Sequence, residues 1–109
     1  MNLFSIPSTL PEEEELKRVL LTDKNVRVEH IVSTGQTTPE NEWCVQDEHE
    51  WVCVLSGVGE LTYDDGLVQR LNAGETTFIP AGSPHQVSYT SGGDDPCVWL
   101  CVFWTPAEQ

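Results

Sequence analysis

Most of this chain consists of short segments rich in β-branched and aromatic residues, and turn residues separate one segment from the next. From Asn25 onward the separators are Gly, Pro, Asn and Asp, as is usual between strands. No convincing helical periodicity and no internal repeat interrupts this pattern. We expect strands at 25–33, 43–46, 50–56, 59–63, 67–71, 76–80, 84–90 and 97–104. Because this many short strands must close on one another, the sequence predicts an all-β jelly roll or barrel.

The N-terminal part differs from the rest in composition. Pro11 is followed by "EEEELKRVLL", with acids first and Lys17 and Arg18 later. Proline in a first turn, acids at the N-terminal end and bases towards the other end are typical of a short helix. We therefore expect an N-terminal segment with a short helix over 1–24, a β-barrel domain over 25–104 and a tail over 105–109.

Length and charge limit the classes of function. A chain of 109 residues is long enough for one domain with a core. With 18 acidic and 5 basic residues the net charge is -13, which disfavours nucleic acid and anionic membrane surfaces as partners. No apolar run reaches the roughly 20 residues of a membrane-spanning helix, and the N-terminus has no signal-peptide pattern. The four cysteines form no CxxC motif, so we expect free thiols and a cytoplasmic protein.

Strand alternation assigns side chains to the two faces of each predicted strand. In "PHQVSYT" His85, Val87 and Tyr89 share one side, which the apolar neighbour assigns to the interior. In "EWVCVLS" Glu50 shares a face with alternate valines, but both faces of this strand are apolar, so alternation alone leaves open which face is inside. A carboxylate inside a barrel is costly unless it is paired, neutralised or bound to a cation, so an inward Glu50 would itself indicate function.

The same count extends back from Glu50 if the register is kept. Cys44 and Gln46 then face inward with Glu50, while His49 points the other way and lies in a solvated turn. For His30 the alternation leaves two positions open, in the cavity or at the surface near a strand end.

The segment around His85 contains a motif of a known protein family. In "GETTFIPAGSPHQVSY" the residues Gly74, Pro80, Gly82 and His85 have the spacing of the second motif of the cupins, and Tyr89 stands where that motif has asparagine. The chain resembles a small single-domain cupin over roughly residues 25–104. The resemblance implies a jelly-roll barrel, also called a double-stranded β-helix, whose two motifs carry a metal site.

The first cupin motif is only partly present. Glu50 lies six residues before a matching glycine, Gly57, as the motif requires. The two histidine positions fall on Cys44 and Gln46, so both imidazoles are replaced.

The resemblance implies a divalent metal and a small molecule in the barrel. The implied ligands are His85, Glu50, Gln46 and Cys44, and the mixed donor set suits iron, manganese, nickel or zinc. In a metal-dependent enzyme, Glu50 or Tyr89 would handle a proton. The alternative is a non-catalytic binding or sensory module without metal, in which Gln46 only forms hydrogen bonds and Cys44 is a small interior residue.

The last predicted strand, "CVWLCVFW", is apolar on both faces. A sheet with one face in water does not need this pattern, so a second subunit or the N-terminal segment should cover the outward side. Cupins commonly form dimers in this way, and the resemblance therefore implies a homodimer.

Overall fold

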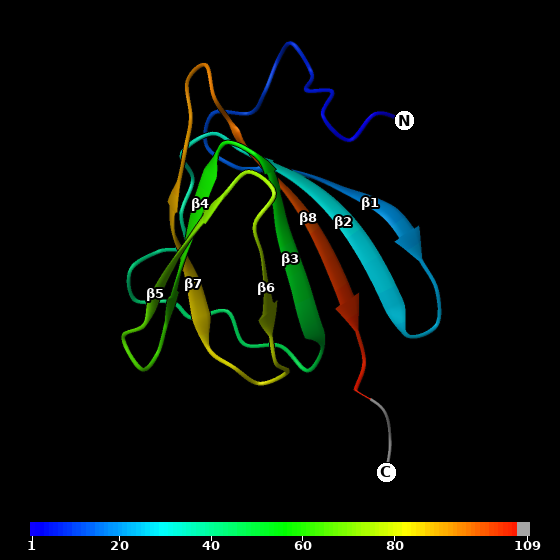
Figure 1. Cartoon of the computed structure of the whole chain (residues 1–109), viewed down its shortest axis with the longest axis vertical. Coiled ribbons are helices and arrows are strands. Elements are labelled where there is room, and N and C mark those ends of the chain that lie inside the picture. Colours follow the sequence, from blue (N-terminus) through cyan, green and yellow to red (C-terminus); the bar gives the residue numbers. More distant parts are fainter. Residues whose placement is uncertain (107–109) are drawn as a thin grey trace.

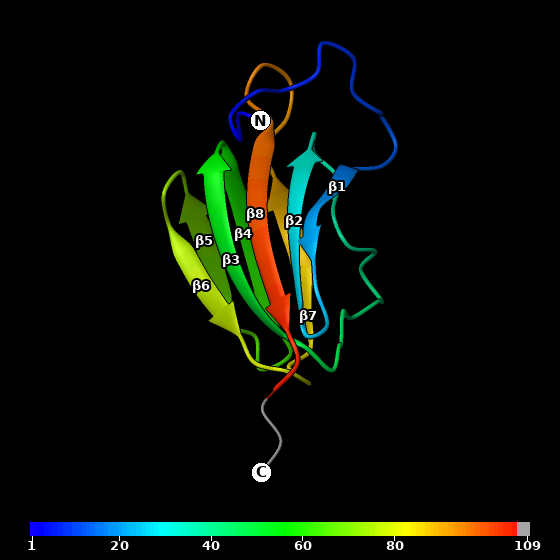
Figure 2. The same ribbon diagram turned by 90° about the vertical axis from the view of Figure 1, so that its right-hand side faces the viewer.

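The computed structural model describes residues 1–106, and these form two antiparallel β-sheets with no helix. The eight strands are β1 (Leu16–Thr22), β2 (Val26–Ser33), β3 (His49–Ser56), β4 (Val58–Tyr63), β5 (Val68–Asn72), β6 (Thr76–Ile79), β7 (His85–Thr90) and β8 (Cys97–Trp104). One sheet has the order β1-β2-β8-β3-β6 and the other β5-β4-β7. Figures 1 and 2 show the two sheets face to face. The predicted all-β jelly roll is confirmed.

Two of the predicted elements are wrong. The expected helix near the N-terminus is absent, and Leu16–Thr22 is instead the edge strand β1, paired with β2. Helix propensity is local and weak, whereas pairing with β2 satisfies the backbone groups of both strands. The predicted strand at 43–46 is reduced to one isolated bridge between Cys44 and His85. Most of the expected tail, 107–109, lies outside the described residues.

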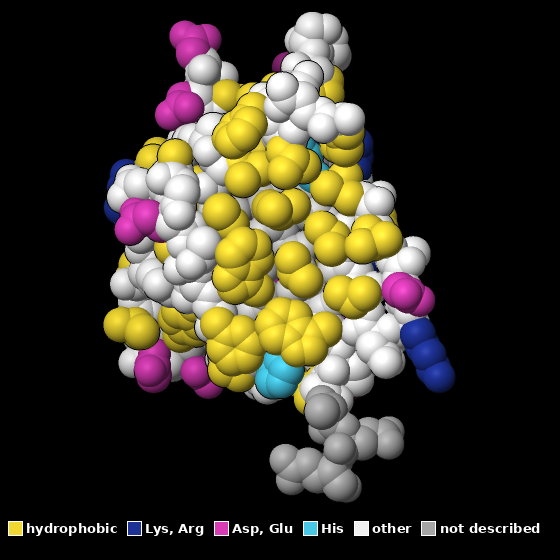
Figure 3. All heavy atoms as spheres, turned by 45° about the vertical axis from the view of Figure 1, so that its right-hand side comes forward, with side chains coloured by type: hydrophobic (Ala, Val, Ile, Leu, Met, Phe, Trp, Pro, Cys, Tyr) yellow, Lys and Arg dark blue, Asp and Glu magenta, His cyan; other side chains and the backbone are white. Residues whose placement is uncertain are grey.

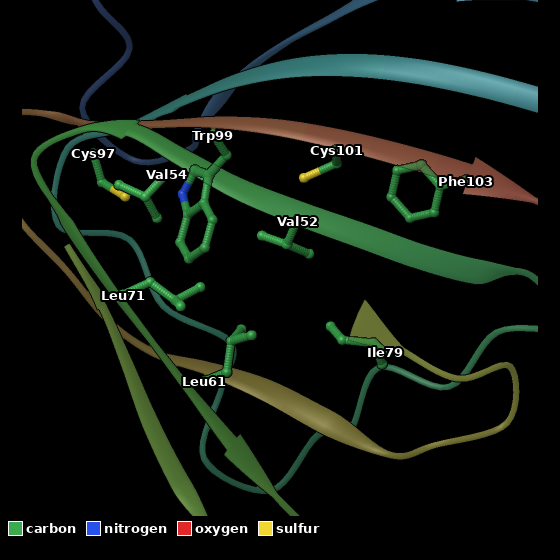
Figure 4. Packing of buried hydrophobic residues seen from close by; sticks show 9 residues of the cluster. All are labelled: Val52, Val54, Leu61, Leu71, Ile79, Cys97, Trp99, Cys101 and Phe103. Atoms are coloured by element: carbon green, nitrogen blue, oxygen red, sulfur yellow. The ribbon is translucent and has the colours of Figure 1, made fainter. Parts of the chain in front are cut away.

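The hydrophobic core fills the space between the sheets. It consists of Val52, Val54, Leu61, Leu71, Ile79, Cys97, Trp99, Cys101 and Phe103, drawn in Figure 4. The indole of Trp99 lies against the backbone of Gly59, and its Nε1 donates to Ser33 Oγ at 3.2 Å. Trp99 therefore fixes the distance between β8 and β4 at one end of the core.

The outward face of the larger sheet is apolar, and one end of it is covered. The N-terminal segment crosses that end, where the backbone oxygen of Leu3 lies 2.7 Å from His30 Nε2. His30 is fully buried there, beside Val32 and Val98. His30 therefore lies neither in the cavity nor at the surface, but beneath the N-terminal segment. No helix among residues 1–106 is long and apolar enough to cross a membrane.

Candidate functional site

A cavity of about 140 Å³ lies between the two sheets. Its lining is largely apolar, but several chemically active side chains face it. The residues that line it are Glu15, Ile31, Cys44, Gln46, Glu50, Val52, Leu61, His85, Val87, Trp99 and Cys101. The structure therefore brings together Cys44, Gln46, Glu50 and His85, four of the five residues for which the sequence suggested a role.

Backbone pairing explains how residues distant in sequence meet here. Glu50 lies on β3 and faces inward with Val52; alternation predicted that the two share a face but left open which face is inside. His85 opens β7, and its backbone exchanges two hydrogen bonds with Cys44, at 2.8 and 3.1 Å. The backbone oxygen of Gln46 accepts a hydrogen bond from Gly82 at 2.8 Å. The segment before β3 is thereby attached to the turn before β7, which places Gln46 between Glu50 and His85.

The centre of the site is a buried carboxyl group beside an imidazole. Glu50 is 8% exposed and His85 is 5% exposed. Gln46 Nε2 donates to Glu50 Oε1 at 2.9 Å, and His85 Nε2 lies 3.8 Å from the same oxygen. The other ring nitrogen, His85 Nδ1, is 3.0 Å from the backbone oxygen of Ser83. A carbonyl only accepts, so Nδ1 carries a proton, and in this tautomer Nε2 presents a lone pair to the cavity.

Burial changes the acidity of two groups in this cavity. The pKa of Glu50 is raised because burial penalises the carboxylate, and the Gln46 hydrogen bond and nearby His85 oppose this effect only in part. The pKa of the Cys101 thiol is raised well above its ordinary value, first by burial and then by Glu50. Burial therefore makes the Glu50 carboxyl a weaker acid than in water, and Cys101 remains a thiol.

The sequence reasoning missed five residues of the lining, namely Glu15, Ile31, Leu61, Trp99 and Cys101. A signal existed for Cys101, because alternate residues of the apolar C-terminal strand share a face with Trp99. Figure 4 shows both side chains pointing from β8 into the space between the sheets. No local pattern places Glu15 here, since it precedes β1 and reaches the cavity only through the pairing of β1 with β2.

The prediction that Tyr89 shares the interior face with His85 is wrong. The pairing of β4 with β7 shifts register between Glu60 and Leu61, so that Tyr89 pairs with Glu60 and Val87 with Leu61. This irregularity adds one residue to β7 and reverses the alternation beyond Val87. Tyr89 is 43% exposed, and the Arg70 guanidinium lies 5.5 Å from its ring centre. Tyr89 lies outside the cavity and cannot act on a molecule within it.

His49 points away from the cavity, as predicted, but it does not lie in a solvated turn. It is the first residue of β3 and its ring packs against Phe78 and Trp104, with ring centres 5.2 and 5.5 Å apart. Its Nδ1 accepts a hydrogen bond from the backbone of Ala81 at 3.0 Å.

The sequence matches the cupin domain over residues 28–103, so the chain belongs to the cupin family. A Ralstonia eutropha JMP134 protein described as a "putative mannose-6-phosphate isomerase" has a similar structure, with a TM-score of 0.87, 31% identity and 97% of both chains covered. A Desulfitobacterium hafniense DCB-2 cupin superfamily protein gives a TM-score of 0.73 at 15% identity, over 90% of this chain and 84% of that one. No curated protein matches the sequence.

An uncharacterised Klebsiella pneumoniae subsp. pneumoniae MGH 78578 protein with a double-stranded β-helix domain is also similar. Its TM-score is 0.73 at 21% identity, over 95% of this chain and 87% of that one. At this identity, as for the Desulfitobacterium protein, the likeness concerns the fold alone.

Cupins often bind metals, but the donor set of this cavity differs from what an ion needs. Within residues 1–106 no group of three or more His, Cys, Asp and Glu side chains is arranged to hold a metal ion. Glu50 and His85 offer strong donors, but Gln46 turns its NH₂ group to Glu50, and an amide N–H is not a ligand. Cys44 is exposed, with its Sγ 4.0 Å from Thr38 Oγ1. Protein zinc sites use three or more protein ligands, so this arrangement does not fit a tightly held resident ion.

Proposed function

We propose that the protein binds a small organic molecule in the cavity between the sheets, without a resident metal ion. The observation that carries this proposal is the Glu50–His85 pair, two buried polar side chains that line an otherwise largely apolar cavity. Among the described residues no hydrogen bond reaches His85 Nε2, which is therefore free to contact a ligand. Pockets with apolar walls and a few convergent polar groups are typical small-molecule sites.

The cavity volume limits the size of the ligand. About 140 Å³ is well below the roughly 300–1,000 Å³ of sites for drug-sized molecules. The apolar part of the ligand would lie against Trp99, Ile31 and Leu61, and its polar group against Gln46, Glu50 and His85.

A second candidate function is acid–base catalysis in the same cavity, which the raised pKa of Glu50 favours. A protonated Glu50 donates a proton, and His85 Nε2 accepts one, which are complementary roles in general acid–base chemistry. This pair would replace the Glu50 and Tyr89 pair expected from the sequence. The fitting reaction class is proton transfer within a small substrate, as in isomerases and lyases.

The test combines metal analysis with binding of a chemically mixed panel of small molecules. The proteins are untagged wild type, Glu50→Gln, His85→Ala and, as a matched control outside the cavity lining, Asp64→Asn in the turn between β4 and β5. We expect less than one metal ion per ten chains in all four, and at least one panel member that binds wild type and the control ten-fold more tightly than the site variants.

Two results would overturn the proposal. One is a stoichiometric metal ion in wild type that is lost from both site variants, which would establish the metal site that the cupin resemblance implies. The other is binding of panel members that is unchanged by Glu50→Gln and His85→Ala, which would place the binding site elsewhere.

The proposed assembly is a homodimer formed through the uncovered part of the outward face of the larger sheet. Figure 3 shows apolar side chains gathered over this face. They include Val28, Leu100, Val102 and Trp104, all half-buried, and Phe78, which is 47% exposed. Large contiguous apolar patches are rare on monomers, and a flat sheet face is readily self-complementary about a two-fold axis.

Sedimentation equilibrium tests the dimer. We expect wild type and the control Leu67→Lys, an exposed position in the β4–β5 turn, to have twice the chain mass. Val102→Lys, which places a charge in the middle of the apolar face, should have the mass of one chain. A monomeric wild type would refute the assembly.

A cytoplasmic location is part of the proposal and is supported by the cysteines. All four are free, and Cys53, Cys97 and Cys101 are buried. Unpaired thiols are the usual state of cysteine in a reducing compartment.

A further inference from the structure

A second, larger hollow adjoins the inner cavity. The outer hollow has a volume of about 400 Å³ and is lined by Glu13, Glu14, Glu15, Gln36, Thr37, Thr38, Pro39, Glu42, Cys44 and Val87. Three of these residues, Glu15, Cys44 and Val87, also line the inner cavity. The two hollows therefore adjoin at these residues, and the outer hollow, one wall of which is the segment before β1, is called the entrance below.

The charges along this route are all of one sign. Carboxylates of Glu13, Glu14 and Glu42 line the entrance, Glu15 lies between entrance and cavity, and Glu50 lies inside. In the described part of the chain no Lys or Arg side chain lines either hollow. The whole chain carries a net charge of -13, which has the same sign as the charge along this route.

The basic residues of the larger sheet are held at other places. Arg27 binds Glu29 at 2.7 Å and Glu48 at 3.0 Å, and Lys17 lies 3.8 Å from Glu29. Arg18 faces the ring of His30, beneath the N-terminal segment. Within residues 1–106 no ion pair connects Glu13, Glu14, Glu15 or Glu42 to a basic side chain.

The route ends at an acceptor that lacks a donor. His85 is 5% exposed, Nδ1 is bonded to Ser83, and Nε2 lies on the cavity side with no hydrogen bond from the described residues. Glu50 Oε1, 3.8 Å from it, accepts a hydrogen bond from the amide of Gln46. Two acceptors side by side are complementary to a ligand group that carries several N–H donors and a positive charge.

On this basis we propose that the ligand is a small aliphatic amine, whose ammonium group passes the glutamates of the entrance and donates to His85 Nε2 and Glu50. The hydrocarbon part lies against Ile31, Leu61 and Trp99. This inference rests on the proposed small-molecule function and adds the chemical class of the ligand. It also separates the chain from the activity in the name of the Ralstonia relative, because a sugar phosphate would meet five carboxylates and no cation.

The experiment compares three small probes of different charge with a larger sugar phosphate. Propylamine is the amine, propanol is its neutral counterpart, butyrate is the anion, and mannose 6-phosphate is the sugar phosphate. Binding is followed by chemical-shift changes of the wild-type backbone amides at neutral pH, in low and in high salt. We expect propylamine to bind at least ten-fold more tightly than the other three and to weaken several-fold in high salt.

Variants locate the effect along the route. Glu50→Gln and His85→Ala should each weaken propylamine at least ten-fold. The double variant Glu14→Gln/Glu42→Gln, at exposed entrance positions, should weaken it several-fold and remove most of its salt dependence. The matched double variant Asp64→Asn/Asp65→Asn, in the β4–β5 turn, removes the same charge and should change neither.

The possible failures are distinguishable. If propanol, butyrate or mannose 6-phosphate binds at least as tightly as propylamine and Glu50→Gln abolishes that binding, the amine is refuted and the small-molecule site stands. If Mn²⁺ or Zn²⁺ binds through Glu50 and His85 while propylamine does not, the site is a metal site and both proposals fail. Equal loss of affinity in the two double variants would show that only net charge matters, which would refute the role of the entrance.

Discussion

Replacing Gly59 by alanine would place a methyl group against the ring of Trp99. A Cβ atom at this position would lie 2.3 Å from Trp99 Cη2 and 2.5 Å from Cζ2, well inside van der Waals contact. Trp99 is 4% exposed, and its Nε1 is held by Ser33 Oγ, so the ring has little freedom to withdraw. Overpacking a well-packed core costs roughly 1–3 kcal/mol, and we expect Gly59→Ala near the upper end of this range.

A double-mutant cycle isolates the steric contact. Trp99→Phe removes the ring carbons that the new methyl meets, and alone it should cost roughly 2 kcal/mol through a cavity and the lost Nε1 bond to Ser33. In the Gly59→Ala background the same change should cost much less. The expected coupling is roughly 1–2 kcal/mol, with the double variant more stable than the sum of the single effects.

The assay is urea unfolding followed by circular dichroism at one fixed chain concentration, because a dimer would make stability depend on concentration. Gly66→Ala is the control, since Gly66 has a φ of 89° but no heavy atom within 4 Å of the added Cβ. It should cost only about 1–2 kcal/mol of backbone strain. A cost below about 0.5 kcal/mol for Gly59→Ala, or additive effects of the two changes, would refute the packing of Trp99 against this backbone.

Three further predictions concern the site and its surroundings. Because the pKa of Glu50 is raised, its contribution to stability is present at low pH and is lost as the pH rises through the folded-state pKa. Glu50→Gln should therefore gain stability over wild type as the pH rises above about 4, by about 1.4 kcal/mol for every ten-fold by which folding increases the proton affinity of the carboxylate. Parallel pH profiles of thermal unfolding for the two proteins would contradict this prediction. Iodoacetamide should modify the exposed Cys44 rapidly and Cys101, whose pKa is raised, only after unfolding, as peptide mass spectrometry would detect. His30→Ala removes the contact to the Leu3 backbone, so it should destabilise the protein by roughly 1–3 kcal/mol and speed proteolysis of the N-terminal segment. An unchanged rate of cleavage would show that this contact does not anchor the N-terminal segment.

Strand alternation predicted the direction of some site residues correctly and of others wrongly. The inward side of His85 was predicted from its apolar neighbour Val87, whereas both faces of the strand that carries Glu50 are apolar, and the packing of the two sheets decides that Glu50 lines the cavity. Tyr89 was misplaced because a register shift between β4 and β7 lies between it and His85. Strand alternation is a local rule, and the position of a bulge depends on a partner strand elsewhere in the chain.

The N-terminal segment shows the same limit for secondary structure. Acids followed by bases favour a helix locally, yet the residues after Glu15 pair with β2 as an edge strand. The free edge of β2 exists only once the sheet has formed, so the residues near the N-terminus do not by themselves predict that pairing. Because β1 forms there, Glu15 reaches the cavity and the preceding glutamates border its entrance.

The sequence by itself determined an all-β chain, the cupin motif spacing, the inward direction of His85, and the replacement of two family histidines by Cys44 and Gln46. These properties follow from residue type and periodicity over a few positions. Only the tertiary structure decided that Gln46 gives its amide to Glu50, that the buried carboxyl binds its proton more tightly, and that glutamates from the N-terminal segment border the cavity entrance. Hydrogen-bond direction, desolvation and electrostatic field depend on distances between residues far apart in the chain, and folding alone sets those distances.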